Sequence, residues 1–196
     1  MKRLSTLLLA VAVCAACNSA AATSNGRPTP VYNKDTGRLE QLLSDRNGDG
    51  KVDTRAFMDG VRFKSIEIDR NGDGRPDRWE YYEPAPGAAG STQSVLVRAE
   101  EANGPTGAIT RKEFYEAGKI HRVEEDTDAD GRIDKWEFYE NGALVRIDFD
   151  LQGKGFADRR IYYDANGVIE RLEVDPDGDG KFDPAPIPAQ AGKGRS

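Results

Sequence analysis

Four segments of this chain place acidic or amide side chains at alternate positions just before a glycine. The pattern is Asp-x-Asp/Asn-x-Asp-Gly, and its copies begin at Asp45, Asp69, Asp126 and Asp175. In a tightly curled loop, alternate side chains converge on one point, and the glycine permits the sharp turn that follows. A ligand set made only of oxygens suits a hard cation, whereas zinc prefers histidine or cysteine.

These loops resemble the calcium-binding loops of EF-hand proteins. Such loops offer oxygens at places one, three, five, nine and twelve, a glycine at place six, and a backbone carbonyl at place seven. The carbonyl would come here from Lys51, Arg75, Arg132 or Lys181. The ligands that the resemblance implies are Asp45, Asn47, Asp49, Lys51 and Asp53; Asp69, Asn71, Asp73, Arg75, Asp77 and Glu80; Asp126, Asp128, Asp130, Arg132, Asp134 and Glu137; and Asp175, Asp177, Asp179, Lys181 and Asp183.

The loops differ in how complete they are. Those at Asp69 and Asp126 have every ligand, so we expect two strong sites. The loops at Asp45 and Asp175 have Ala56 and Pro186 at the twelfth place, so we expect weaker binding there. Two related segments begin at Asp150, with Lys154 at place five, and at Ala102, which keeps only Glu113. We expect neither to bind metal, and the Lys154 ammonium is a candidate stand-in for the cation.

Calcium is the cofactor that this ligand set favours. Magnesium prefers a small octahedral shell that keeps several waters. The alternative is that the segments are only Asp-Gly turns, whose side chains hydrogen-bond their own backbone. A turn needs a single Asp, however, and each pair of carboxylates at about 4 Å costs on the order of 1–4 kcal/mol without a cation.

A repeat of about 24 residues organises the chain. The starts at Asp45 and Asp69, and those at Asp126 and Asp150, are 24 residues apart. With the segments at Ala102 and Asp175 this makes six loops, and extra residues at 84–94 read as an insertion in a hairpin tip. Repeats of this length indicate an array of small supersecondary units.

Each loop is followed by features of a β-hairpin. An aromatic run such as Trp136–Tyr139 leads to a turn such as Asn141-Gly142, and then polar and apolar residues alternate from Leu144 to Phe149. The hairpins are similar to YD and MORN-type repeats. The predicted fold is therefore all-β, an antiparallel β-meander of about ten to twelve strands joined by EF-hand-like Asp-rich loops. We expect aromatic and aliphatic residues on one face, with Tyr, Arg and Glu on the other.

The N-terminus has the features of a bacterial signal peptide at residues 1–16. Lys2 and Arg3 precede a short apolar stretch, and the segment Val13–Cys17 resembles a lipobox, which implies lipidation (palmitate) of Cys17. Asn18 is not the Asp of an inner-membrane retention signal, so the resemblance points to the outer membrane, with the body periplasmic or surface-exposed. Cleavage near Ala20 without lipidation, giving a secreted protein, is the alternative.

The remaining segments complete the predicted domain organisation. Residues 17–37 comprise the lipidated cysteine and a flexible tether, residues 38–183 the repeat domain, and residues 184–196 a disordered tail. The loops are also similar to the Asp-rich loops of thrombospondin type 3 repeats and of dockerins. The cysteines of the former and the helices of the latter are missing from this pattern.

Composition narrows the functions. With 34 Asp and Glu against 28 Lys and Arg, the chain lacks the basic excess typical of nucleic-acid binders. His121 is the single histidine, and no nucleophile with its base is apparent, so we expect no enzyme. The main hypothesis is a calcium-binding envelope lipoprotein with a structural or interaction role. The alternatives are a module that binds a glycan or partner protein through a Tyr/Arg-rich sheet face and, third, an envelope hydrolase.

Overall fold

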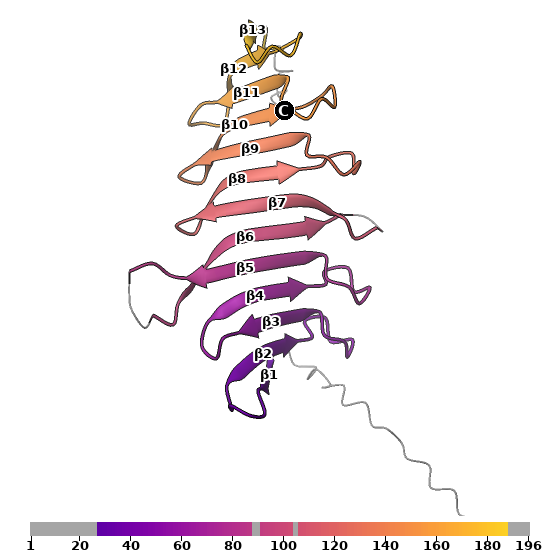
Figure 1. Cartoon of the computed structure of the whole chain (residues 1–196), viewed down its shortest axis with the longest axis vertical. Coiled ribbons are helices and arrows are strands. Elements are labelled where there is room, and N and C mark those ends of the chain that lie inside the picture. Colours follow the sequence, from indigo (N-terminus) through magenta and orange to yellow (C-terminus); the bar gives the residue numbers. More distant parts are fainter. Residues whose placement is uncertain (1–26, 88–90, 104–105, 188–196) are drawn as a thin grey trace, which may run out of the picture.

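The protein is a single antiparallel sheet in which every strand pairs with the next in sequence (Figure 1). The computed structural model describes residues 27–87, 91–103 and 106–187. Cys17, the predicted signal peptide and the last residues of the predicted tail lie outside these ranges. The strands are β1 (Thr29–Tyr32), β2 (Leu39–Ser44), β3 (Thr54–Met58), β4 (Phe63–Ile68), β5 (Arg78–Pro84), β6 (Ser94–Ala102), β7 (Ile109–Glu116), β8 (Lys119–Glu125), β9 (Lys135–Glu140), β10 (Ala143–Phe149), β11 (Arg159–Tyr163), β12 (Ile169–Val174) and β13 (Asp183–Ala185).

The predicted all-β meander is confirmed. The sheet is open, with β1 and β13 as its two edges. No helix occurs in the described ranges, and so none there is long and apolar enough to cross a lipid bilayer. The residue 84–94 insertion is the tip of the β5–β6 hairpin, as expected.

The sheet is longer at both ends than the sequence predicted. Strand β1 lies within the segment 17–37 predicted to be a tether, and β13 includes Pro184 and Ala185 of the predicted tail. Proline-rich composition suggested disorder in both places. An edge strand tolerates proline, because one of its backbone sides has no partner strand and needs no N–H donor.

The turns and the Asp-rich loops lie along opposite sides of the sheet (Figure 1). Tight turns join β1 to β2, β3 to β4, and so on, and each of these hairpins has a register shift close to its turn, as between Tyr81 and Tyr82. Such bulges increase the local twist. The six loops that join β2 to β3, β4 to β5, and onward to β12 and β13 share the other side.

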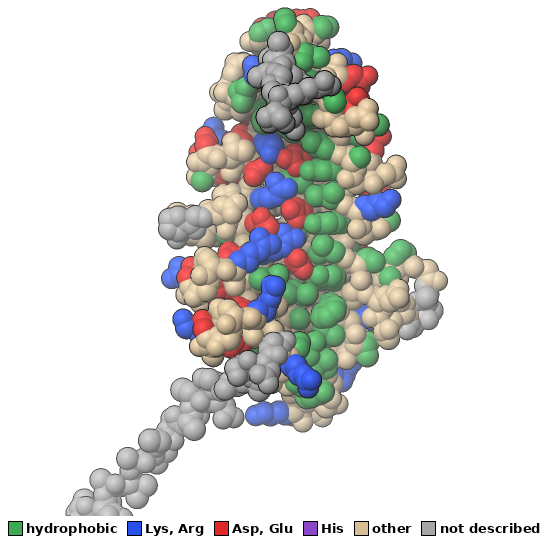
Figure 2. Space-filling view, turned by 180° about the vertical axis from the view of Figure 1, so that it is seen from behind, with side chains coloured by type: hydrophobic (Ala, Val, Ile, Leu, Met, Phe, Trp, Pro, Cys, Tyr) green, Lys and Arg blue, Asp and Glu red, His purple; other side chains and the backbone are tan. Residues whose placement is uncertain are grey.

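One face of the sheet carries a row of alternating charges, and we call it the ion-pair face. Pairing places Arg78, Glu101, Arg111, Glu125 and Lys135 side by side on five successive strands. Figure 2 shows this face from behind, where acidic and basic side chains alternate in a column beside a column of hydrophobic side chains. That column includes the pairs Tyr82–Leu96, Tyr115–Ile120, Tyr139–Leu144 and Tyr163–Ile169, near the turns.

The charged row is a connected network rather than a set of isolated pairs. The Arg78 guanidinium, 10% exposed, lies 2.9 Å from Glu80, 2.5 Å from Glu101 and 3.1 Å from Glu113. Arg111 contacts Glu113 and Glu125 in the same way. Buried charges are tolerated only when paired and hydrogen-bonded, and these meet that condition.

The opposite face carries a row in which aromatic rings alternate with arginines, and we call it the arginine–ring face. The row runs from β5 to β12 as Tyr81, Arg98, Phe114, Arg122, Phe138, Arg146, Tyr162 and Arg171. The expectation that aromatic residues gather on one face is wrong. In runs such as Trp79–Tyr82, successive side chains point to opposite faces of the sheet, so the rings divide between them.

Breaking the ion-pair network is expected to destabilise the sheet. Arg78→Met removes the cation that three largely buried carboxylates share and leaves Glu80 without its arginine partner, so the free energy of unfolding should fall by about 3–5 kcal/mol. Urea unfolding measures it. The matched control is Arg70→Ala, since Arg70 also pairs with Glu101 but is 52% exposed, and its loss should cost at most about 1 kcal/mol. Equal losses for both variants would contradict the network's role.

Candidate metal centre

The Asp-rich loops share one hydrogen-bonding scheme, in which the first Asp anchors the loop. In the Asp45 loop, the buried Asp45 carboxylate accepts hydrogen bonds from the backbone N–H groups of Gly48 (2.6 Å) and Gly50 (2.9 Å). Asp69 and Asp175 make the same two contacts with their own loops. The glycine at place six, for example Gly131 with φ 93°, adopts a conformation that other residues avoid.

In the loops at Asp45, Asp69, Asp126 and Asp150, the ninth residue closes the loop from the other side. Asp53 accepts a hydrogen bond from the Arg46 N–H at 2.7 Å, and Asp134 accepts from the Thr127 N–H and hydroxyl. Asp77 and Asp158 act alike. Place nine, predicted to hold metal, therefore spends at least one of its oxygens on the backbone of its own loop.

The acids at places one, three and five come together at two loops. Carboxylate oxygens of Asp126, Asp128 and Asp130 lie within 4.8 Å of one another, and so do those of Asp175, Asp177 and Asp179. In both groups the first acid is buried and the other two are exposed. The loops at Asp45 and Asp69 have Asn47 and Asn71 at place three, and so bring one charge fewer.

The two clusters differ in the charge around them. Lys181 Nζ lies 2.6 Å from Asp179, which offsets part of the negative charge of the Asp175 cluster. Across residues 27–87, 91–103 and 106–187, no lysine or arginine forms an ion pair with Asp126, Asp128 or Asp130. The Asp126 cluster is thus the least compensated group of acids and the most favourable place for a divalent cation.

The twelfth-place glutamates are held away from the loops. Glu137 lies on β9, where its carboxylate is 2.6 Å from Lys135 Nζ and accepts a 2.6 Å hydrogen bond from the Tyr139 hydroxyl. Glu80 is held on β5 by Arg78 and Tyr82. The structure therefore does not place these side chains with the loop acids, and their assignment as ligands needs correction. In an EF-hand, the twelfth place lies where a helix begins. Here it lies on a strand, which directs the glutamate side chain onto the ion-pair face.

The same contacts shift the pKa values on this face. Burial alone would raise the pKa of Glu137, but hydrogen bonds from Lys135 and Tyr139 and the charge of Arg111 hold it below its usual value. The pKa of Glu113 is lowered against its burial in the same way, by Tyr115, Arg111 and Arg78. The pKa values of Tyr82 and Tyr139 are raised by burial and by their hydrogen bonds to Glu80 and Glu137, respectively.

The loop at Asp150 forms although its ligand set is incomplete. Asp150 accepts hydrogen bonds from the Lys154 and Gly155 N–H groups, at 3.0 and 2.5 Å. The Lys154 ammonium lies over the Phe156 ring, and a Cβ on Gly178 would be 3.3 Å from it. This lysine thus extends toward the Asp175 loop and does not take the cation's place among the acids of its own loop.

Neighbouring loops are joined directly through the backbone. The N–H of each loop's first residue donates to the carbonyl of the preceding loop's ninth residue, as from Asp69 to Asp53 and from Asp150 to Asp134, both at 2.8 Å. The bonds from Ala102 to Asp77, Asp126 to Thr110 and Asp175 to Asp158 continue the series. The loops therefore form one connected column along the edge of the sheet.

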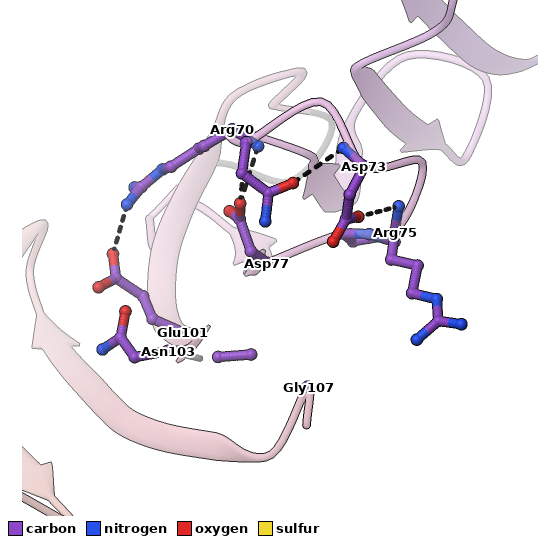
Figure 3. Close-up of a pocket in the computed structure, with 10 residues that line it drawn as sticks. Arg70, Asp73, Arg75, Asp77, Glu101, Asn103 and Gly107 are labelled. Atoms are coloured by element: carbon purple, nitrogen blue, oxygen red, sulfur yellow. Dashed lines mark hydrogen bonds and ion pairs between the residues drawn. The ribbon is translucent and has the colours of Figure 1, made fainter. Parts of the chain in front are cut away.

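A polar pocket of ≈ 390 Å³ lies between the Asp69 loop and the Ala102 segment (Figure 3). Arg70 crosses it to Glu101 at 3.0 Å, while Arg75 points away from both. Oδ1 of Asp77 is buried there and has no hydrogen-bond partner among the described residues. The lining includes two arginines, and Arg70 already pairs with Glu101, so the pocket offers less uncompensated negative charge than the Asp126 cluster.

Comparisons with known proteins give no family. No protein family matches the chain, and no curated protein matches it in sequence. Among solved structures, it is similar to a chain in the crystal structure of accessory secretory protein 1, 2 and 3 of Streptococcus pneumoniae, with 21% identity and a TM-score of 0.35. That match covers 72% of this chain and 23% of the other, so the chain spans about a quarter of that protein's length.

Acidification is expected to weaken the ion-pair face. Because the folded-state pKa values of Glu113 and Glu137 are lowered, their stabilisation is complete above the unfolded pKa and is lost as pH falls through the folded pKa. The urea midpoint should therefore drop between about pH 6 and pH 3, the range that spans ordinary carboxyl pKa values. The double variant Glu113→Gln/Glu137→Gln should be less stable at pH 6 and less pH-dependent. If the urea midpoint of that variant depended on pH as steeply as that of the wild type, Glu113 and Glu137 would not be the groups responsible.

Proposed function

We propose that this chain is a calcium-binding protein of the bacterial cell envelope, in which calcium ions order the loops along one side of the sheet. The observation that carries the proposal is the cluster of Asp126, Asp128 and Asp130, whose carboxylate oxygens lie within 4.8 Å with no cation paired to them. Asp175, Asp177 and Asp179 supply a second site. Each loop is pre-shaped by its anchoring Asp, so an ion would bind without large rearrangement.

Calcium is the proposed ion because of the number and type of ligands. Three carboxylates and one backbone carbonyl, from Arg132 or Lys181, fill part of the six to eight places that calcium takes at oxygen, and water would fill the others. With the twelfth-place glutamates occupied elsewhere, affinity near that of extracellular modules, about 10⁻⁴ to 10⁻³ M, is expected. We propose a structural or interaction role and no enzymatic one.

Calorimetric titration of the metal-free protein tests the sites. Wild-type protein should take up calcium at millimolar concentration, and Asp130→Ala and Asp179→Ala should each remove one binding event, because each deletes a carboxylate from one cluster. Glu137→Gln should leave calcium affinity unchanged, since Glu137 faces Lys135 and Tyr139 rather than the ion.

The control for charge is Glu140→Ala, an exposed acid at the turn side of the sheet. It should bind calcium as the wild type does. Calcium in excess should also raise the melting temperature of the wild type but less so that of the Asp130→Ala/Asp179→Ala double variant, since a ligand that binds only the folded state stabilises it. A metal-free protein that binds no calcium at about 10 mM, above the weakest extracellular modules, refutes the proposal.

The proposed location rests on the N-terminal sequence. Lipidation of Cys17 would anchor the sheet at the outer membrane, while cleavage without lipidation would release it. In cells that express the full chain, Cys17→Ala should move the protein from the membrane fraction to the soluble fraction and abolish labelling by palmitate. Labelling that persists in this variant would contradict the anchor at Cys17.

A further inference from the structure

The arginine–ring face carries one stacked cation per hairpin. The guanidinium carbons of Arg98, Arg122, Arg146 and Arg171 lie 4.1, 5.4, 4.0 and 3.8 Å from the centroids of the rings of Tyr81, Phe114, Phe138 and Tyr162, respectively. Each ring and its arginine sit on the two strands of one hairpin, from β5–β6 to β11–β12. Stacking fixes the planes of side chains that would otherwise be mobile.

The acids that accompany these arginines lie deeper in the sheet. Each arginine is paired with an acid two residues later, and these acids, Glu100, Glu124, Asp148 and Glu173, are 7–17% exposed. The arginines themselves are 30–52% exposed. The outermost charged layer of this face is therefore cationic, although the whole chain has a net charge of −6.

The positive charge exceeds the negative at the C-terminal half of the row. Asp148 is shared by Arg146, at 2.9 Å, and Arg160, at 3.4 Å. The Arg160 guanidinium carbon also lies 3.7 Å from the centroid of the Phe182 ring. Along the whole row, Arg98, Arg122, Arg146, Arg160 and Arg171 pair with four acids. Each guanidinium has five N–H donors, which is more than its ion pair uses, so the partly exposed arginines can also bind an external anion.

The spacing of the row restricts the partner. Successive arginines are two strands apart, and strands in a sheet lie about 4.8 Å apart, so the cations repeat at about 9.6 Å. Phosphates of a nucleic-acid duplex recur about every 3.4 Å along one strand, and same-side residues of an extended peptide about every 6.7 Å. A linear polysaccharide with one acidic group per disaccharide repeats at about the spacing of the arginines.

We propose that the arginine–ring face binds a linear acidic polysaccharide that lies across strands β6 to β12, with one carboxylate at each of Arg98, Arg122, Arg146 and Arg171. Contact with the rings holds the guanidinium groups in place before the ligand arrives, which lowers the ordering cost of binding. This site is on a sheet face, away from the loops along its edge, and does not depend on calcium.

The test uses hyaluronan oligosaccharides, which have one carboxylate per disaccharide, and is carried out in a chelator so that the calcium sites are empty. We expect an oligosaccharide of about eight sugars, which matches four arginines at this spacing, to bind more tightly than one of about four. Raising the salt concentration should weaken binding. A chitin oligosaccharide of equal length should not bind, since it carries no acid.

The variants separate this row from charge in general. Arg122→Gln/Arg146→Gln should lose about tenfold or more in affinity, because two of four charge-assisted contacts are removed. The matched control is Arg75→Gln/Arg132→Gln, which removes the same charge from exposed loop positions and should stay within about twofold of wild type. Arg122→Lys/Arg146→Lys keeps the charge without the planar stack, and should bind at an intermediate level.

Circular dichroism and melting temperature establish that each variant is folded. Should Arg122→Gln/Arg146→Gln fail to fold, the dependence of wild-type affinity on oligosaccharide length still tests the proposal. Equal binding of the short and long oligosaccharides, binding of the neutral chitin chain, or equal loss in the two glutamine variants would overturn the proposal. Tighter binding of a DNA oligonucleotide or of polyglutamate than of hyaluronan would overturn it as well.

Discussion

Pairing between side chains on adjacent strands is the interaction on which this sheet depends, because a single layer has nothing to pack against. Only Leu43, Ala56, Ala99, Ala102 and Val123 are buried hydrophobic residues in the described part of the chain. Both faces therefore meet water, and the strands are stabilised by neighbours in the row. Ion pairs serve this purpose on one face, and ring–guanidinium stacks serve it on the other.

The same constraint explains how charge can be buried so freely. A long arginine or glutamate covers the strand beneath it with its aliphatic part while its end group pairs across the row. Ala99 and Val123, both 0% exposed, flank Glu113 in one such row, so the apolar and charged side chains protect each other from water. The sheet thus grows by adding hairpins that lengthen these rows, and a longer sheet does not need a larger hydrophobic core.

The loops connect one hairpin to the next along one side of the sheet, where each lies directly beside the loop before it. Their first and ninth residues make backbone contacts within a loop and between loops. The acids at places three and five also accept backbone N–H groups, as Asp128 does from Asp130 and Asp130 from Arg132, but through one oxygen each. Since the Asp150 loop makes the same contacts with Lys154 at place five, the loop shape does not require a cation. What a turn alone does not explain is the convergence of three acids at each of two loops, where the oxygens of Asp126, Asp128 and Asp130, and those of Asp175, Asp177 and Asp179, lie within 4.8 Å of one another.

Sequence reasoning reached the strands, the repeat and the loops, because each is encoded by local spacing. It failed for the side chains that pair on the sheet face, whether with residues of the same strand or with a strand two away. Arg78, Glu80 and Tyr82 share one face by their period of two, as do Lys135, Glu137 and Tyr139, and this recurring Arg/Lys-x-Glu-x-Tyr pattern was the available signal that the glutamates belong to the sheet. Contacts such as that of Arg78 with Glu113, 35 residues apart, depend on the register of pairing and cannot be read from one repeat.

The sheet's two ends limit how readily a second copy could extend the array. Free strand edges invite pairing with another chain, and a row of paired charges would not prevent it. Edge strand β1 contains Pro30, and edge strand β13 contains Pro184. Each proline removes a backbone donor from its strand, and β13 is three residues long, so the edges offer few hydrogen bonds to a second copy. With few backbone donors at its ends, the sheet offers the loop side and its two faces as the larger surfaces through which this protein can meet its partners.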